Sequence, residues 1–319
     1  MSISRRAFVQ SAAALLATGC ARPRSAGFLV HDAGLSHEAR LPLGFSTLGC
    51  PGWDWQRILD FAQAHRFGAV ELRGIGTQMD LPLLPTLQPA QLAQTRRELA
   101  AHDLVVSCLG SSTNLHEMEP AKHEAELAHA RRFIDLAQAL GAPWVRVFGN
   151  KYVAGVPRDQ MLAHIAAGLR TLGDYAKERG VTILLESHGD FVDSPTLVEL
   201  MRRADGPGVA LLWDAHHTFA FGKEEPEATL IAIKSHVRHV HLKDSVPAGA
   251  DRRYVLTGTG DVPVGRQIAA LAKSGYRGVY SFEWEKRWHP EIEEPEVAFP
   301  QFADFATRYL RQAGVSAGA

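Results

Sequence analysis

The sequence has little of what marks several classes of protein. Its three cysteines cannot build a disulfide framework, and no two of them have the CxxC spacing of a zinc ribbon. No apolar run approaches the ~20 residues needed to span a bilayer. Neither sign of charge is in excess, because 34 Lys+Arg stand against 35 Asp+Glu and the net charge is −1. We therefore expect no nucleic-acid partner and no anionic membrane surface.

What the sequence does contain is typical of a folded globular protein. Hydrophobic residues make up 46% and charged residues 22% of the 319 positions, which excludes wholesale disorder. This length allows two average domains, but single α/β barrels also reach it. Histidine is abundant, with 15 residues, and its positions carry more information than its number.

The first 20 residues are predicted to be a signal segment. Ser4-Arg5-Arg6-Ala7-Phe8 and the weakly apolar stretch from Ser11 to Thr18 resemble a twin-arginine export signal, which implies the twin-arginine export machinery as a partner. Ala17-Thr18-Gly19-Cys20 resembles a lipobox, although a Leu is expected where Ala17 stands. We therefore expect an exported protein, either periplasmic or a lipoprotein anchored to the membrane through Cys20. Residues 21–40 are predicted to be a linker.

From residue 41 onward, short apolar runs alternate with amphipathic helical stretches. The predicted strands are Leu43–Leu48, Ala69–Leu72, Leu104–Leu109, Trp144–Phe148, Val181–Leu185, Val209–Trp213, Val237–Leu242 and Val279–Phe282. Eight βα units predict a single-domain (β/α)₈ TIM barrel over residues 41–312, with a tail at 313–319. An open doubly wound sheet is the rival fold, but the usual phosphate-binding glycine pattern does not follow the first strand.

Polar side chains follow four consecutive predicted strands, at the point where each strand ends. The segments are Glu186-Ser187-His188, Asp214-Ala215-His216-His217, His239-Val240-His241-Leu242-Lys243-Asp244 and Ser281-Phe282-Glu283-Trp284-Glu285. The active site of a TIM barrel lies at this end of the strands. Three carboxylates that converge in a partly dry site repel one another, so we expect a divalent cation between them. Three oxygen ligands and one imidazole suit Mn²⁺, Mg²⁺, Co²⁺ or Fe²⁺ better than Zn²⁺.

With Leu43-Gly44-Phe45-Ser46-Thr47 and the Gly258-Thr259-Gly260 turn, these segments resemble the xylose-isomerase-like TIM-barrel superfamily, in its sugar phosphate isomerase/epimerase group. In ketose 3-epimerases of that superfamily the matching positions bind one divalent metal ion. The resemblance thus implies four ligands here: Glu186, Asp214, His241 and Glu283. It also implies that Glu186 and Glu283 act as the acid/base pair on opposite faces of the substrate, and that His217 contacts a sugar oxygen.

Several other residues are candidates for substrate contacts. His188 is expected to point inward beside Glu186, because residues two apart on a strand share a face. Lys243 and Glu71 are expected either to line the pocket or to form buried ion pairs. Arg252 is a candidate for reaching a substrate oxygen. Cys50 and Cys108 are expected to be buried thiols, with their pairing left open.

The leading hypothesis is a metal-dependent sugar isomerase or epimerase that transfers a proton next to a carbonyl. Because sugar phosphates are cytoplasmic, an exported enzyme is expected to act on free or oxidised sugars. A lyase or hydrolase of 3-keto-glycosides on the same site, a phosphodiesterase of the endonuclease IV type and a non-catalytic sugar-binding protein are the alternatives. The endonuclease needs an Asp-Arg-His motif after the seventh strand, where this chain has Asp251-Arg252-Arg253. Homo-oligomer formation stays open.

Export is testable by cell fractionation. The wild type is expected to leave the cytoplasm and to lose its first residues, whereas the double variant Arg5→Lys/Arg6→Lys is expected to stay inside, because the arginine pair is the recognised feature. Cys20→Ser is expected to release the protein from membranes only if the lipobox is used. The export hypothesis is wrong if the wild type also stays cytoplasmic with an intact N-terminus.

Overall fold

The computed structural model describes residues 40–249 and 251–315 of the chain. The predicted signal segment lies outside these residues. The predicted linker, apart from its last residue, and the tail beyond residue 315 also lie outside them. The Arg40 side chain fixes the start of the described chain, because its Nη1 donates to the carbonyl oxygens of Phe67, His102 and Asp103 at 3.1–3.2 Å. Among the described residues no helix has the length and apolar character required to cross a membrane.

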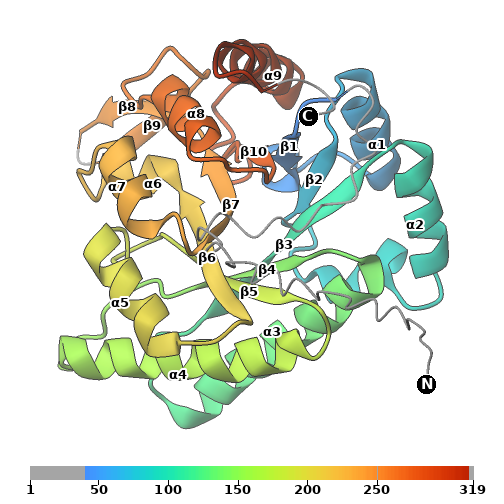
Figure 1. Cartoon of the computed structure of the whole chain (residues 1–319). Helices are drawn as coiled ribbons and strands as arrows, with labels where there is room; N and C mark the ends of the chain where they lie inside the picture. The colour runs from blue at the N-terminus through green and yellow to red at the C-terminus, as the bar shows by residue number, and fades with distance from the viewer. Residues whose placement is uncertain (1–39, 250, 316–319) are drawn as a thin grey trace, which may run out of the picture.

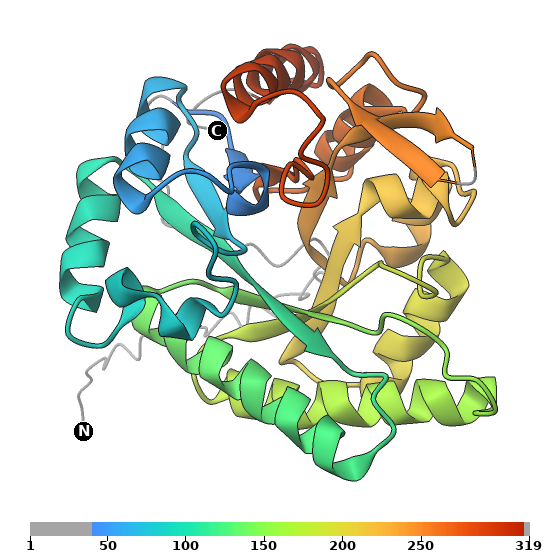
Figure 2. The same ribbon diagram turned by 180° about the vertical axis from the view of Figure 1, so that it is seen from behind.

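Eight parallel strands close into a barrel, in the order β1-β10-β7-β6-β5-β4-β3-β2. The strands are β1 Leu43–Ser46, β2 Ala69–Leu72, β3 Val105–Asn114, β4 Trp144–Phe148, β5 Thr182–Glu186, β6 Val209–Asp214, β7 Val237–Leu242 and β10 Tyr280–Phe282. Figures 1 and 2 show the strands at the centre and the helices around them. The predicted single-domain TIM barrel is therefore confirmed.

Helices follow the barrel strands and cover their outer face. The α-helices are α1 Trp55–Ala64, α2 Leu92–Ala101, α3 Pro120–Leu140, α4 Arg158–Lys177, α5 Ser194–Ala204, α6 Ala215–Ala220, α7 Pro226–Ile233, α8 Val264–Lys273 and α9 Pro295–Gln312, and the short 3₁₀ helices are η1 Thr47–Gly49, η2 Leu81–Leu83 and η3 Pro85–Leu87. Local sequence sets several helix ends: Asp54 and Asp193 cap α1 and α5 with their side chains, and Gly141 ends α3 at φ 77°.

The aromatic residues of α9 close the core between the first and last units. The Phe299 ring lies 4.5 Å from that of Phe45 and 5.8 Å from that of Phe282, and the Phe302 ring stacks on Phe282 at 4.4 Å. These contacts join α9 to β1 and β10, which are neighbours in the closed barrel. The last helix thus packs across the seam between the first and last strands of the barrel.

The interior of the barrel divides into an apolar floor and a polar mouth. The apolar floor is a small buried cluster, separate from the main core, that comprises Cys108, Trp144, Leu184, Ala210 and Leu212. Because side chains alternate along a strand, Leu184 shares its face with Glu186, and Leu212 shares its face with Asp214. The inward rows therefore run from apolar side chains to carboxylates at the C-terminal ends of the strands, where the site was expected.

The structure corrects some predicted boundaries and adds elements. The predicted strand Leu43–Leu48 ends at Ser46, because the Thr47 hydroxyl bonds the Gly74 carbonyl oxygen at 2.6 Å and the chain turns into η1. Helix α6 was not predicted, and it begins directly after β6 because the Asp214 carboxylate caps it. The hairpin of β8 (Asp244–Ala248) and β9 (Asp251–Val255), visible beside α8 in Figure 1, was also missed.

The buried Asp244 carboxylate anchors that hairpin. It accepts hydrogen bonds from the backbone N–H groups of Ser245, Gly258, Gly260 and Val262 at 2.8–3.2 Å. A β-carbon at Gly260 would lie 2.1 Å from Asp244 Oδ1, so only glycine permits this approach. The Gly258-Thr259-Gly260 turn is therefore built around Asp244, and the hairpin is held beside the barrel mouth.

Candidate functional site

The structure brings the four predicted metal ligands together. Each of Glu186, Asp214, His241 and Glu283 offers one ligand atom, these atoms lie within 4.8 Å of one another, and all four side chains are buried. His241 Nδ1 is at the centre, 3.2 Å from Glu283 Oε2, 3.7 Å from Glu186 Oε1 and 3.9 Å from Asp214 Oδ2. The residues come from β5, β6, β7 and the end of β10, as the strand-end pattern predicts.

Asp214 uses its two oxygens for different purposes. Its Oδ1 accepts the backbone N–H of His217 at 3.0 Å and so caps α6. Its Oδ2 faces the cluster, 3.9 Å from His241 Nδ1. The start of α6 thereby fixes the orientation of this carboxylate.

Glu71 orients His241 from inside the barrel. Its Oε2 lies 2.8 Å from Nε2 of both His241 and His239, and the hydroxyls of Ser46 and Ser281 approach its two oxygens at 3.4 Å. Burial raises the pKa of Glu71, but the two imidazoles outweigh it and hold that pKa well below its ordinary value. Of the two roles considered for Glu71, the structure therefore shows the buried ion pair, through which Glu71 positions His241.

The donor set fits a divalent cation. His241 Nδ1 is buried and has no hydrogen-bond partner within residues 40–249 and 251–315, while Nε2 is occupied by Glu71. Around it, five buried carboxylates face only three buried basic groups; the carboxylates are Glu71, Glu186, Asp214, Glu283 and Glu285, and the basic groups are Arg73, Arg146 and Lys243. An imidazole nitrogen that lies among buried carboxylates offers, together with their oxygens, a set of ligand atoms that a divalent ion would fit.

Lys243 lies inside the same cluster. Its Nζ is 2.6 Å from Asp214 Oδ2 and 2.9 Å from Glu285 Oε1, and it also bonds Glu283 Oε2. Burial lowers the pKa of Lys243, but these carboxylates raise it well above its ordinary value, so the side chain stays a cation. Of the two roles considered for Lys243, the structure shows the buried ion pair.

Both glutamates of the predicted acid/base pair are ionised. Burial raises the pKa of Glu186, but Arg146, whose Nη1 lies 2.7 Å from Oε2, and His241 together outweigh it and bring that pKa to about 2. Burial acts in the same sense on Glu283, and His241 and Lys243 together hold its pKa well below the ordinary value. Each carboxylate is therefore available at neutral pH as a proton acceptor or a metal ligand.

His188 and His217 stand next to the ligand cluster. The His188 ring packs against the rings of Phe148 and His217, with centroid distances of 4.6 Å and 5.0 Å. Its Nδ1 is buried and has no hydrogen-bond partner in the described part of the chain. Burial lowers the pKa of His188 to about 4. His217 Nδ1 bonds the Ser187 carbonyl oxygen at 3.0 Å. The neutral His188 ring is thus the better placed of the two to exchange a hydrogen bond with a ligand.

Arg252 does not join the cluster. Its Nε bonds the Ser245 hydroxyl at 2.5 Å, its Nη2 bonds the Ser245 carbonyl oxygen at 3.1 Å, and it also pairs with Asp261. These contacts lie within the hairpin and the turn that follows. The structure therefore shows Arg252 holding β8 and β9 together, and its contact with a substrate stays a prediction.

The structure also adds residues that the sequence analysis did not place in the site. Glu285 pairs with Lys243, and it could have been found because it shares the inward face of Glu283. Arg146 lies in the apolar run of β4, where a charged residue is itself a signal of function or ion pairing. Tyr254 from the hairpin stacks near His216 at 5.5 Å, and nothing in the local sequence indicates that contact. Cys50 and Cys108 are buried, as expected, and the structure shows both as free thiols.

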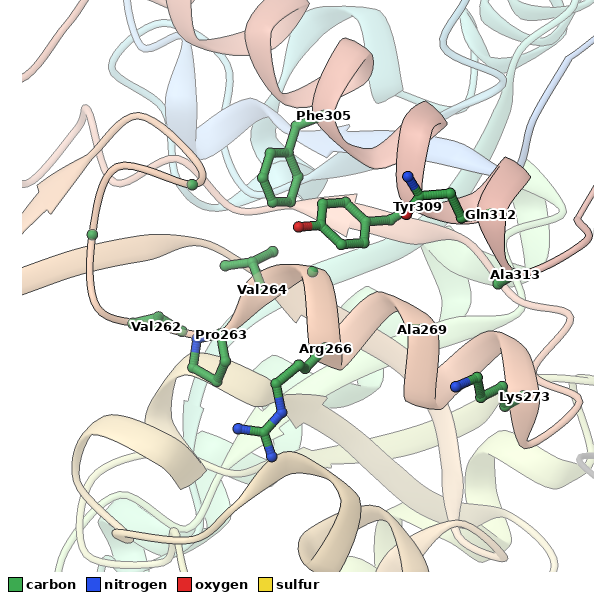
Figure 3. Close-up of a pocket in the computed structure, with 13 residues that line it drawn as sticks. Val262, Pro263, Val264, Arg266, Ala269, Lys273, Phe305, Tyr309, Gln312 and Ala313 are labelled. Carbon is green, nitrogen blue, oxygen red and sulfur yellow. The ribbon is translucent and has the colours of Figure 1, made fainter.

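A surface pocket between α8 and α9 lies elsewhere. Figure 3 shows Phe305 and Tyr309 from α9 over Val264 at the start of α8, with the Arg266 side chain directed away from the two rings. The Tyr309 ring packs on the start of α8, where a β-carbon at Gly265 would come within 2.3 Å of it. None of the metal-ligand candidates lines this pocket.

Comparisons with known proteins agree with this architecture. The family model described as xylose isomerase-like TIM barrel matches residues 59–305, and the chain belongs to this family. An inosose dehydratase of Bacillus cereus is 29% identical over 166 residues, 46% of this chain and 53% of that protein. A 3-dehydroshikimate dehydratase of Pseudomonas putida is 29% identical over 50% of this chain and 26% of its own length. The chain thus spans about half the length, or less, of these relatives.

Solved structures share the fold at low sequence identity. A D-psicose 3-epimerase determined in the presence of D-fructose has a TM-score of 0.67 and 14% identity, covering 88% of this chain and 100% of that one. The IOLI protein, determined with a bound zinc atom, has a TM-score of 0.67 and 17% identity over 87% of this chain and 98% of its own. At this identity the likeness shows the fold alone.

The metal centre predicts a sharp difference between two histidines. His241→Ala is expected to abolish retention of the divalent ion, because it removes a ligand. His239→Ala removes the other imidazole on Glu71 and is expected to keep about one ion per chain. Metal content after exhaustive dialysis measures both. Three ions per chain would favour the endonuclease alternative, and equal retention by the two variants would contradict the assignment.

Because Glu71 orients His241 without itself being a ligand, its replacement is expected to weaken metal binding less than the loss of a ligand does. Glu71→Gln is expected to lower the affinity for Mn²⁺ about 10–100-fold, the usual cost of losing a partner that orients a ligating histidine. Calorimetric titration of the metal-free protein measures it. As a control, Glu178→Gln changes an exposed carboxylate and is expected to leave the affinity unchanged. An unchanged affinity in Glu71→Gln would show that His241 needs no such support.

Proposed function

We propose that this protein is a metal-dependent enzyme that removes a proton from the carbon next to the carbonyl group of a sugar or a related polyhydroxy ketone. The observation that carries the proposal is the pair of buried, ionised carboxylates Glu186 and Glu283, which approach His241 Nδ1 from β5 and from the end of β10. Two strands separate β5 and β10 in the barrel, so the two carboxylates can face opposite sides of a ligand bound between them.

The residues divide the chemistry as follows. One glutamate accepts the proton from carbon. The other is also ionised at rest, so it first accepts a proton from a substrate hydroxyl or from water and then delivers it to the carbon skeleton from the other face. Lys243, a buried cation whose N–H groups pair with Asp214, Glu283 and Glu285, adds positive charge near the oxygen on which negative charge develops. A divalent ion held by Glu186, Asp214, His241 and Glu283 would polarise the carbonyl group and offset that charge. His188 and His217 are the candidates for contacts to substrate hydroxyls.

The fate of the abstracted proton decides the reaction. Delivery of a proton to the same carbon from the opposite face gives an epimer. Delivery of a proton to the former carbonyl carbon, while the hydroxyl on the neighbouring carbon loses its proton and becomes the new carbonyl, gives an isomer. Loss of a β-hydroxyl as water gives a dehydration, which is the second candidate because the relatives reported above are named dehydratases. Elimination from a 3-keto-glycoside belongs to the same class. If the export signal is used, a free or oxidised sugar is the expected substrate.

The endonuclease alternative has less support. The hairpin that carries Asp251-Arg252-Arg253 holds Arg252 in contacts with Ser245 and Asp261, and it brings no histidine to the cluster. A second group of potential metal ligands comprises Asp214, His216 and His217. In that group, His216 Nε2 is engaged with the Ser245 hydroxyl at 2.7 Å. We therefore propose a small-molecule substrate and no nucleic-acid partner.

The proposal predicts proton exchange that depends on both glutamates. With Mn²⁺ present, D-fructose, D-psicose, an inosose and a 3-keto-glucoside are incubated in D₂O and followed by NMR. Deuterium beside the carbonyl, or release of water or of the glycosidic group, is expected for at least one of them. Glu186→Gln and Glu283→Gln are each expected to slow it about 10²–10⁴-fold.

Two controls complete this experiment. Glu178→Gln changes an exposed carboxylate on the outer surface and is expected to react at the wild-type rate. Circular dichroism checks that the glutamine variants are folded. Near-normal rates in both glutamine variants would contradict the assigned pair and would make His188 the next candidate base.

A further inference from the structure

Two buried arginines lie side by side on the β2–β4 side of the barrel mouth. Arg73 directly follows β2, and Arg146 is on β4. Between them runs β3, where Gly110 has no side chain. A β-carbon at Gly110 would lie 2.6 Å from Arg73 Cδ and 2.8 Å from Arg146 Nη2, so the missing side chain makes room for both guanidinium groups.

Both guanidinium groups have N–H donors for which the described residues supply no hydrogen-bond acceptor. The exposed fractions of Arg73 and Arg146 are only 7% and 2%, yet Arg73 Nη1 and Arg146 Nε and Nη2 have no hydrogen-bond partner among the described residues. Arg73 donates to the Ser112 hydroxyl at 3.0 Å, and no carboxylate of the described chain lies within ion-pair distance of it. Burying unpaired cationic donors is costly, so the arrangement calls for an anionic acceptor.

The rest of the site explains why that acceptor must come from a ligand. Arg146 is already fixed by Glu186 at 2.7 Å and by the Phe148 ring, whose centroid lies 3.9 Å from its Cζ. Burial and the neighbouring Arg146 lower the pKa of Arg73 to about 9, which leaves it a cation at neutral pH. Four of the five buried carboxylates around His241, in contrast, come from β5, β6 and the segment after β10: Glu186, Asp214, Glu283 and Glu285. The mouth is therefore bipolar, with guanidinium donors on one side and the candidate metal ligands on the other.

We propose that Arg73 and Arg146 bind a carboxylate group of the substrate, so that the enzyme acts on a keto acid of the sugar or cyclitol type rather than on a neutral sugar. A planar carboxylate matches the paired N–H donors of guanidinium groups. Because Arg146 also holds Glu186, the substrate's anionic end would lie next to the metal ligands that act on its carbonyl end. This inference rests on the proposed function and narrows its substrate class.

A matched pair of probes tests the inference by binding rather than by turnover. Equilibrium binding of 3-dehydroshikimate and of its uncharged methyl ester is measured by calorimetry on the Mn²⁺-loaded protein, with inorganic phosphate as a competitor. The acid is expected to bind at least about tenfold more tightly than the ester, the scale of one hydrogen bond to a charged group.

Variants locate the preference for the acid. Arg73→Gln is expected to bring the acid-to-ester ratio close to one while the ester's own affinity and the Mn²⁺ content stay unchanged, and Arg73→Lys is expected to restore part of the ratio. Gly110→Ala, which crowds both guanidinium groups, is expected to weaken the acid more than the ester. Arg238→Gln, a barrel-strand arginine bonded to the Ser235 and Val237 carbonyls, serves as the control and is expected to keep the wild-type ratio.

The outcomes separate this inference from the proposed function. The inferred carboxylate site is wrong if the acid does not bind, if acid and ester bind equally, or if Arg73→Gln weakens the binding of both alike. It is also wrong if inorganic phosphate displaces the bound ester and the acid fails to displace it. Selective binding of the acid that depends on Arg73 supports the anion site even when no proton exchange follows, and in that case only the proposed reaction fails.

Discussion

The crowding of buried carboxylates around one imidazole nitrogen is the constraint on which the rest of the site depends. Glu186, Asp214 and Glu283 approach His241 Nδ1 within 3.2–3.9 Å in a region closed to solvent. Such a group is stable only with compensating positive charge. Arg146 and Lys243 supply part of it from the chain, and a divalent ion would supply the remainder.

The closed barrel tolerates this concentration of buried charge because the alternation of side chains along the strands keeps the charged groups apart from the apolar floor. The inward row of β5 passes from Leu184 to Glu186, and that of β6 from Leu212 to Asp214. Polar contacts below the cluster then fix its geometry: Glu71 holds His241, and the start of α6 holds Asp214. The same alternation gives the mouth its two sides, guanidinium groups towards β2–β4 and carboxylates towards β5–β10.

Local sequence signals predicted the barrel and the gathering of the four ligand candidates, because both follow from period-two strands that end in polar residues. They did not predict the hairpin around Asp244, since that buried carboxylate bonds backbone groups 14 to 18 residues away. The start of α6 was missed although its signal is local, because Asp214 caps the backbone N–H of His217. Arg252 has the chemistry of a ligand contact, but its tertiary partners are Ser245 and Asp261. Arg73 was overlooked because its neighbour across β3, Arg146, is distant in the sequence.

The most direct test of the account is diffraction from crystals grown with Mn²⁺, with data collected at its absorption edge. The account predicts one strong anomalous peak in bonding distance of His241 Nδ1 and of carboxylate oxygens from Glu186, Asp214 and Glu283. A map with no peak at this position, while Lys243 alone bridges the carboxylates, would contradict the claim that the cluster is built to hold a divalent ion.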